Sequence, residues 1–306
     1  MLVICDDVYD FLPWGDNSHP ESPRPLPRLV TLDRQLILAH WAREIGRNGE
    51  EGDMEAGNVL SNCSFSKLLG PGLRCGWQES ATGVLARQLA EGGANHSGGC
   101  PSQFVSAVVG ELLRPVSRDE AEGKDKDVKA AAGSGEKGSR KMKRKINEII
   151  AGVKPVLGSR ASLFIDASYK YLPPGSEVLG HPPASTSSPR GNSGGGYFLW
   201  VSLGPPPPPG QPPAYNAREI VKLAAQGEPP IGDAAEAEGG GEWINKVTVG
   251  SGDLFECPGN GNAMGFGERW VRIAVSWCEE VEGVEGIRRL GRACTRWMHE
   301  RKGAET

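Results

Sequence analysis

The sequence predicts an α/β protein, because short apolar runs typical of buried strands alternate with segments that repeat apolar residues at helical spacing. Two amphipathic patterns, over residues 104–113 and 281–297, place apolar residues three or four positions apart. Strand-like runs lie on both sides of the first pattern. The chain of 306 residues also contains 43 Gly and 24 Pro, which indicates long loops between the ordered elements.

The first half of the chain contains three predicted strands and one predicted helix. Residues 2–5 are continuously apolar and are followed by acidic residues, as expected for a buried strand that delivers polar side chains at its carboxyl end. Residues 28–32 and 59–63 predict further strands. The helix begins at Pro101 and ends before Pro115.

The second half opens with a helical pattern that follows a basic cluster at residues 140–145 and has apolar residues at 146, 149, 150 and 153. Three predicted strands come next, at residues 197–203, 246–249 and 271–276, and the terminal amphipathic helix closes the chain. No internal repeat has the spacing of a solenoid or a propeller.

Several stretches rich in Gly, Pro, Ser or charge lack hydrophobic periodicity and predict flexible insertions. The run of prolines from 205 to 209 predicts a polyproline II spacer, with a docking site for an aromatic-lined partner as the alternative. The predicted insertions are residues 46–58, 117–140, 173–196, 204–213 and 226–242.

Composition excludes several classes of function. The net charge of −4 gives no broad cationic surface, so we expect no nucleic-acid binding. The seven cysteines form no C-x-x-C pair and do not cluster with the histidines, so we expect no metal site and reduced thiols in the cytoplasm. We also expect no membrane span, because no window approaches the ~20 apolar residues that one needs.

The stretch from Ser64 to Trp77 carries the strongest chemical signal. It follows a predicted strand and contains hydroxyls, Lys67, a Gly-Pro-Gly turn and Arg74. A lysine with apolar neighbours and a nearby cation can form an imine with a carbonyl compound. The hydroxyls and Arg74 could bind a phosphate group. The alternative is an ordinary lysine at the boundary between a strand and a loop.

The motifs around this lysine resemble the signature of class I/II pyridoxal-phosphate-dependent aminotransferases of fold type I. The residues that carry the resemblance are S-F-S-K at 64–67 and P-G-L-R at 71–74, with D-D-V-Y at 6–9 as the family's D-x-x-Y element. The details are similar to a eukaryotic branch related to 2-aminoadipate and aromatic aminotransferases. Three further elements follow in the family's order, at residues 98–103, 195–200 and 271–277.

The resemblance implies a role for each residue near the cofactor, pyridoxal phosphate. Lys67 would hold the cofactor as an internal aldimine and then move the proton between the substrate Cα and the cofactor. Asp6 would pair with the pyridine nitrogen, with Asp7 as the competing candidate. Tyr9 would donate its hydroxyl to the phenolic oxygen of the cofactor.

The remaining implied residues bind anions. Ser64 and Arg74 would bind the cofactor phosphate with help from Ser66, and Arg272 would bind the α-carboxylate of the substrate. Taken without the resemblance, Arg272 would instead form a salt bridge on the face of a sheet.

The resemblance also implies a division of the chain. Residues 1–116 would be the C-terminal part of the large cofactor-binding domain, with a mainly parallel sheet, and residues 117–306 would form a smaller C-terminal α/β domain. Family members have a long segment before the strand that carries Asp6, with a glycine-rich phosphate loop and an aromatic ring that stacks on the cofactor. We therefore expect an incomplete chain, with an exposed sheet edge and weakened cofactor binding.

The implied function is transfer of an amino group from an L-amino acid to a 2-oxo acid by a ping-pong exchange, with a homodimer as the complete protein. Two alternatives stay open. One is a non-catalytic ligand-sensing or regulatory protein, although no helix-turn-helix or basic stripe accompanies the domain. The other is a lyase or decarboxylase that uses the same cofactor. The identity of the amino acid is not predicted.

Overall fold

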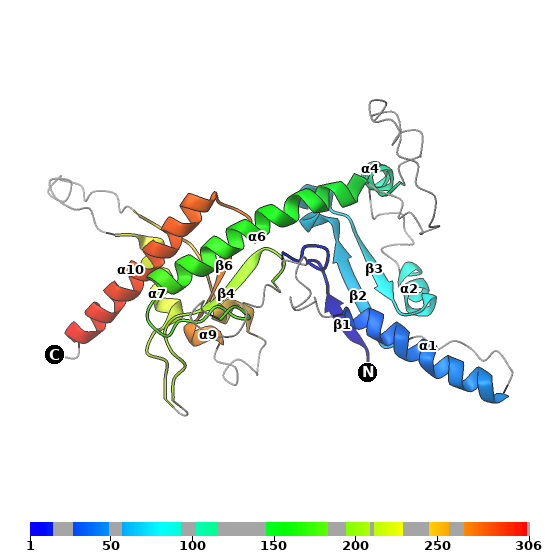
Figure 1. Ribbon diagram of the computed structural model, residues 1–306, viewed down its shortest axis with the longest axis horizontal. Helices are drawn as coiled ribbons and strands as arrows, with labels where there is room; N and C mark the ends of the chain where they lie inside the picture. The colour runs from blue at the N-terminus through cyan, green and yellow to red at the C-terminus, as the bar shows by residue number, and fades with distance from the viewer. Residues whose placement is uncertain are drawn as a thin grey trace, which may run out of the picture. The chain divides into compact units, whose positions relative to one another are not determined.

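The computed structural model describes residues 1–14, 27–48, 57–92, 102–114, 145–182, 194–208, 211–228, 245–256 and 266–304 (Figure 1). The chain divides into two compact units. The N-terminal unit contains Met1–Pro13 and Pro25–Lys154, and the C-terminal unit contains Trp14–Arg24 and Pro155–Thr306. The domain boundary expected at residues 116 and 117 lies outside the described residues and stays a prediction.

The N-terminal unit contains a three-stranded sheet in the order β1-β2-β3. Strand β1 (Val3–Asp6) runs parallel to β2 (Val59–Ser64), and β3 (Gly76–Ser80) runs antiparallel to β2. The strand predictions for residues 2–5 and 59–63 are therefore confirmed. Strand β1 lies at the edge of this described sheet, and its Ile4 side chain is 66% exposed.

The strand prediction for residues 28–32 is wrong, because these residues lead into helix α1 (Leu29–Asn48). The apolar run is too short to reveal its period by itself. Over a longer stretch, the buried residues Val30, Asp33 and Ile37 recur at helical spacing. The Asp33 carboxylate accepts hydrogen bonds from the backbone N–H groups of Asn58 and Val59, at 2.8 and 3.0 Å, which ties α1 to the start of β2.

Three more helices contribute to the N-terminal unit. Helix α2 (Gly83–Ala90) follows β3, and α4 (Gln103–Leu113) confirms the predicted helix over this range, although the proposed start at Pro101 lies outside the described residues. Helix α6 (Lys145–Tyr171) confirms the helical pattern at 146–153. It begins in this unit and continues, through Pro155, into the C-terminal unit.

The C-terminal unit contains a second three-stranded sheet, in the order β4-β6-β5 and antiparallel throughout. Strands β4 (Phe198–Ser202) and β6 (Trp270–Ala274) confirm the strands expected at 197–203 and 271–276. Helices α7 (Ala217–Gln226) and α10 (Glu280–Ala304) lie side by side (Figure 1). The short helices η4 (Gly252–Phe255) and α9 (Phe266–Arg269) complete the unit's described elements.

The strand expected at residues 246–249 is displaced along the chain. Strand β5 is Gly250–Ser251, and the residues before it are not in a strand. Asn245 has a left-handed backbone conformation, with φ of 59°, and the Val247 N–H donates to the Ala224 carbonyl oxygen at the end of α7. The Val247 N–H therefore bonds to the end of a helix and not to a neighbouring strand.

The core of the C-terminal unit depends on a close approach between α6 and α10. A Cβ atom added at Gly283 of α10 would lie 1.8 Å from the fully buried Phe164 ring of α6, so this position requires glycine. Val201, Val271 and Leu290 are also fully buried in this unit. None of the helices in the described ranges combines the length and apolar character of a membrane-spanning segment.

The predicted insertion at 173–196 begins as ordered structure. Val178 forms bridges with Val201 and His181, and the Ser202 N–H donates to the Glu177 carbonyl oxygen at 2.8 Å. Val178 is buried, so this part of the segment packs onto β4. Residues 183–193 of this insertion, and most of the insertions at 46–58, 117–140 and 226–242, lie outside the described residues.

Cys294 of α10 provides a test of the packing of the C-terminal unit. Burial raises the pKa of the Cys294 thiol to about 12, and the residue is 1% exposed. Because the thiolate is the reactive form, we expect iodoacetamide at about pH 8 to modify Cys294 at least ~10-fold more slowly than the partly exposed Cys75. Mass spectrometry of the native protein measures both rates. Equal rates would show that the α10 core opens readily.

Candidate functional site

The carboxyl ends of β1 and β2 meet at one edge of the N-terminal sheet. Asp6, the last residue of β1, pairs in register with Asn62 of β2, and the Asp7 N–H donates to the Asn62 carbonyl oxygen at 2.9 Å. Ser64, two residues after Asn62, ends β2. Side chains two positions apart on a strand share a face, so Asp6 and Ser64 lie on the same side of the sheet. This edge is where α/β sheets commonly bind ligands.

The two candidate carboxylates, Asp6 and Asp7, have different surroundings. Asp7 Oδ2 accepts a hydrogen bond of 2.5 Å from the Ser61 hydroxyl on the opposite face of β2 and lies 3.8 Å from the Arg28 guanidinium. Asp6 is exposed, and its carboxylate forms no ion pair within the described part of the chain. The environment therefore leaves Asp6, rather than Asp7, available to a ligand cation.

Tyr9 lies in the turn that follows β1. The turn is closed by backbone hydrogen bonds from Asp10 N–H to the Asp7 carbonyl oxygen, at 3.3 Å, and from Leu12 N–H to the Tyr9 carbonyl oxygen, at 2.8 Å. The Lys67 Nζ atom lies over the Tyr9 ring, 5.6 Å from its centroid, within the range of a cation–π contact. The turn thus places Tyr9 beside Lys67.

Lys67 ends the short 3₁₀ helix η1 (Phe65–Lys67), which directly follows β2. Phe65, at the start of η1, is buried and packs against Trp77 with a centroid distance of 4.5 Å. The Phe65 N–H donates to the Cys75 carbonyl oxygen at 3.0 Å, and the Phe65 carbonyl oxygen accepts from Leu68 and Leu69. These contacts fix the backbone that carries Lys67, while the Lys67 side chain itself is half-buried.

The proposed phosphate ligands lie at the same sheet edge as Lys67. Ser64 caps η1, since its Oγ accepts from the Ser66 N–H at 3.0 Å. Arg74 ends the second short helix, η2 (Pro71–Leu73), in a left-handed conformation with φ of 49°. The hydrogen bond between Phe65 and Cys75 closes the loop that contains both Lys67 and Arg74. Six of the seven predicted site residues belong to the N-terminal unit: Asp6, Tyr9, Ser64, Ser66, Lys67 and Arg74.

Arg272, the seventh, belongs to the C-terminal unit and lies on β6 opposite Trp200 and Gly250. Its guanidinium carbon stacks between two aromatic rings, 4.0 Å from the Phe198 centroid and 3.8 Å from the Phe255 centroid. No carboxylate of the described residues forms an ion pair with it. The sheet-face salt bridge is therefore absent from the described structure, and the planar guanidinium is held by ring stacking.

Sequence reasoning missed a group of charged residues centred on Arg28. Its guanidinium contacts Ser61 and Cys63 of β2, Glu79 of β3, and Asp7 and Asp10 in the turn. Burial and the neighbouring Asp7 raise the pKa of Asp10, and Arg28 opposes this rise. Burial also acts to raise the pKa of Glu79, but hydrogen bonds from Arg34 and Arg28 lower it below its ordinary value. Assigning residues 28–32 to a strand hid this arrangement.

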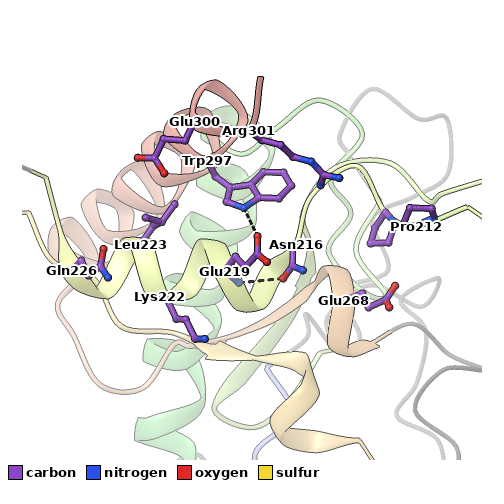
Figure 2. Close-up of a pocket in the computed structure, with 11 residues that line it drawn as sticks. Pro212, Asn216, Glu219, Lys222, Leu223, Gln226, Glu268, Trp297, Glu300 and Arg301 are labelled. Atoms are coloured by element: carbon purple, nitrogen blue, oxygen red, sulfur yellow. Dashed lines mark hydrogen bonds between the residues drawn. The ribbon is translucent and has the colours of Figure 1, made fainter. Parts of the chain in front are cut away.

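A cavity of about 740 Å³ in the C-terminal unit holds none of the predicted residues (Figure 2). The Trp297 indole N–H of α10 donates to Glu219 Oε2 of α7 at 2.7 Å, and Asn216 Oδ1 accepts from the Glu219 N–H at 3.1 Å. Lys222 and Arg301 add positive charge to the lining. The pattern Asn-x-x-Glu at 216–219 is a helix start signal that could have revealed α7 from the sequence.

Across the ranges that the structure describes, His, Cys, Asp and Glu side chains form no group of three or more that could hold a metal ion. The chemistry available at the sheet edge is instead that of an amine, a phenol, a carboxylate, hydroxyls and a guanidinium. These groups fit a ligand that combines an aldehyde, a cationic ring nitrogen and a phosphate.

Comparison with curated proteins and family models gives one relative without an assigned function. No protein-family model matches the chain. A Saccharomyces cerevisiae protein that is described as uncharacterized is 32% identical over 294 residues, which make up 96% of this chain and 48% of the yeast protein. The chain thus spans about half the length of this relative.

Several solved structures that match the fold of this chain are described as aminotransferases. The alpha-aminoadipate aminotransferase of Thermus thermophilus, complexed with N-(5'-phosphopyridoxyl)-L-leucine, has a TM-score of 0.54 and 19% identity, over 98% of this chain and 51% of that one. The kynurenine aminotransferase of Pyrococcus horikoshii, in complex with PMP, has a TM-score of 0.54 and 17% identity, over 97% and 48%. An aminotransferase of Candida albicans has a TM-score of 0.51 and 18% identity, over 98% and 51%.

Proposed function

We propose that this chain, which has the fold of the pyridoxal-phosphate-dependent aminotransferases of fold type I, is the lysine-bearing part of an aminotransferase. The reaction would exchange the amino group of an L-amino acid for the oxo group of a 2-oxo acid. The amino acid leaves as a 2-oxo acid, and the 2-oxo acid leaves as an amino acid. The likeness to solved structures supports the fold, and the chemistry is argued from the residues.

The observation that carries the proposal is the placement of Lys67. Its amine lies over the Tyr9 ring at the carboxyl end of β2, beside the end of β1, where Asp6 is exposed. An amine, a phenol and a carboxylate thus come from two adjacent parallel strands and the turns that follow them. This arrangement favours a functional lysine over the alternative, an ordinary solvated lysine at the boundary between a strand and a loop.

Pyridoxal phosphate, when bound, supplies an aldehyde and a ring that withdraws electrons from the substrate Cα. Lys67 would hold the aldehyde carbon through its Nζ atom and then carry the proton to and from the substrate Cα. Asp6 would face the ring nitrogen and keep it protonated. Tyr9 would direct its hydroxyl toward the ring oxygen.

The phosphate would bind at the loop closed by Phe65 and Cys75. Ser64 Oγ already accepts from the Ser66 N–H, so its own hydroxyl proton can be donated to a phosphate oxygen. Arg74 would add a charged, bidentate contact. Ser66 would donate a second hydroxyl.

Arg272 would bind the α-carboxylate that amino acids and 2-oxo acids share. Stacking between Phe198 and Phe255 holds the plane of its guanidinium and leaves the edge of the fork for a carboxylate. Because both half-reactions use this group, one arginine serves both substrates.

The experiment is absorbance titration of the purified chain with pyridoxal phosphate, followed by borohydride reduction and peptide mapping. We expect visible absorbance above that of the free cofactor and a covalent adduct on Lys67. Lys170, whose Nζ lies 5.0 Å from the Tyr171 ring centroid, is an internal control because it is another lysine placed over a tyrosine. An adduct spread equally over Lys67, Lys170 and other lysines would contradict the proposal.

A further inference from the structure

Arg28 connects the site's sheet to the turn that carries Tyr9. It donates to Ser61 Oγ at 2.5 Å and to Glu79 Oε2 at 2.7 Å, and it forms ion pairs with Asp7 and Asp10. We propose that Arg28 is a positioning residue that fixes Tyr9 against Lys67 by holding the carboxylates on both sides of Tyr9. This inference rests on the proposed function, because it concerns the same site.

The contacts of Arg28 come from separate segments of the N-terminal unit. Ser61 belongs to β2 and Glu79 to β3, whereas Asp7 and Asp10 belong to the turn after β1. A guanidinium presents five N–H donors in one plane, so a single arginine can bind several acceptors in a fixed geometry. Arg28 therefore relates the turn to the strands that place Lys67.

The position of the turn determines the contact between Tyr9 and Lys67. Asp7 precedes Tyr9 by two residues and Asp10 follows it by one. Of the turn's two backbone hydrogen bonds, the one from the Asp10 N–H is long, at 3.3 Å. Arg28 restrains this part of the turn through its ion pair with the Asp10 side chain. Its loss would allow Tyr9 to move away from Lys67.

The negative charges of the turn make its conformation depend further on Arg28. The carboxylates of Asp7 and Asp10 repel each other, and burial raises the pKa of Asp10 further. The groups near them are Arg28, Glu79, the Ser61 hydroxyl, and the Cys5 and Cys63 thiols, whose pKa values are raised by burial. Arg28 is thus the cation that compensates these carboxylates, and its removal would leave them to separate or to take up a proton.

Arg34 of α1 provides a matched control, since Arg28 directly precedes the same helix. It also binds Glu79, at 2.9 Å, and donates to the carbonyl oxygens of Ser80 and Ala81, so these contacts are with β3 and the residue after it rather than with the turn. Arg34→Gln therefore removes an ion pair with the same partner, Glu79, without releasing the turn. If Arg28 had only a general structural role, Arg28→Gln and Arg34→Gln would change the exchange of the turn's amides and the affinity for pyridoxal phosphate to a similar extent.

The first measurement is amide hydrogen exchange in the cofactor-free protein. In Arg28→Gln, we expect the Leu12 amide, which donates to the Tyr9 carbonyl oxygen, to exchange at least tenfold faster than in the wild type. In Arg34→Gln, the exchange rate of the Leu12 amide should stay within twofold of the wild-type rate. Equal exchange of Leu12 in the two variants would overturn the inference.

The second measurement is the dissociation constant of pyridoxal phosphate, read from the visible absorbance. We expect at least a tenfold increase in Arg28→Gln, partial recovery in Arg28→Lys, and less than a twofold change in Arg34→Gln. A loosened turn with unchanged affinity would also overturn the inference, because the turn would not then position the site. If the wild type formed no adduct on Lys67, the proposed function would fail, and the exchange of Leu12 would still decide whether Arg28 holds the turn.

Discussion

Replacing Lys67 with alanine is expected to remove the covalent cofactor adduct and to lower the rate of amino transfer by about 10²- to 10⁴-fold, the usual contribution of a positioned acid–base group. Both losses have one cause, because the same Nζ atom would hold the aldehyde carbon and carry the substrate's Cα proton. Ser64, Arg74 and Asp6 would remain, so the variant should still bind the cofactor noncovalently. Single-turnover measurements with a panel of amino acids check the rate, and borohydride trapping checks the adduct.

Lys170→Ala is the matched control for this variant. Lys170 lies near the end of α6, and its Nζ is also near a tyrosine ring, that of Tyr171. We expect its adduct formation and turnover to stay within about twofold of the wild type, as is usual for a surface substitution. If Lys67→Ala retained the adduct, or if both variants lost activity to the same extent, the role assigned to Lys67 would be wrong.

The fold could be predicted where periodicity extended over a whole element. The amphipathic pattern at 281–297 lies within α10, and the strand predicted at 59–63 corresponds to β2. Prediction failed at 28–32, where the start of a longer helix resembles a strand in a short window. It also misplaced the strand at 246–249, because the Val247 hydrogen bond to the end of α7 is a tertiary contact that no local pattern contains.

The candidate site shows the same division between local and tertiary information. Lys67, Ser64 and Arg74 lie within one short stretch, so their joint spacing could be recognised in the sequence. The D-x-x-Y spacing selects Asp6 over Asp7 in the sequence, whereas the contacts that occupy Asp7 come from Ser61 and Arg28 in other segments and have no local pattern. Arg28 itself has no motif, since its contacts with β2, β3 and the turn exist only after folding.

Replacing Arg272 with alanine is expected to lower kcat/KM by roughly 10²-fold for substrates that carry an α-carboxylate. Each hydrogen bond to a charged group contributes about 1.5–3 kcal/mol, and a guanidinium fork makes two of them. Steady-state kinetics with an amino acid and with its decarboxylated amine separates this effect from general damage. The amine has no carboxylate to lose, so its kcat/KM should change by less than about threefold.

The rings beside Arg272 explain why lysine is a poor replacement. Stacking between Phe198 and Phe255 holds a plane, whereas an ammonium group has neither a plane nor a fork. The Phe255 ring reaches Arg272 over Gly250, where an added Cβ would lie 3.1 Å from the ring. We therefore expect Arg272→Lys to recover only part of the carboxylate binding. Full recovery by lysine would mean that charge alone binds the carboxylate, and an equal loss for the amino acid and the amine would show that Arg272 supports the sheet rather than the substrate.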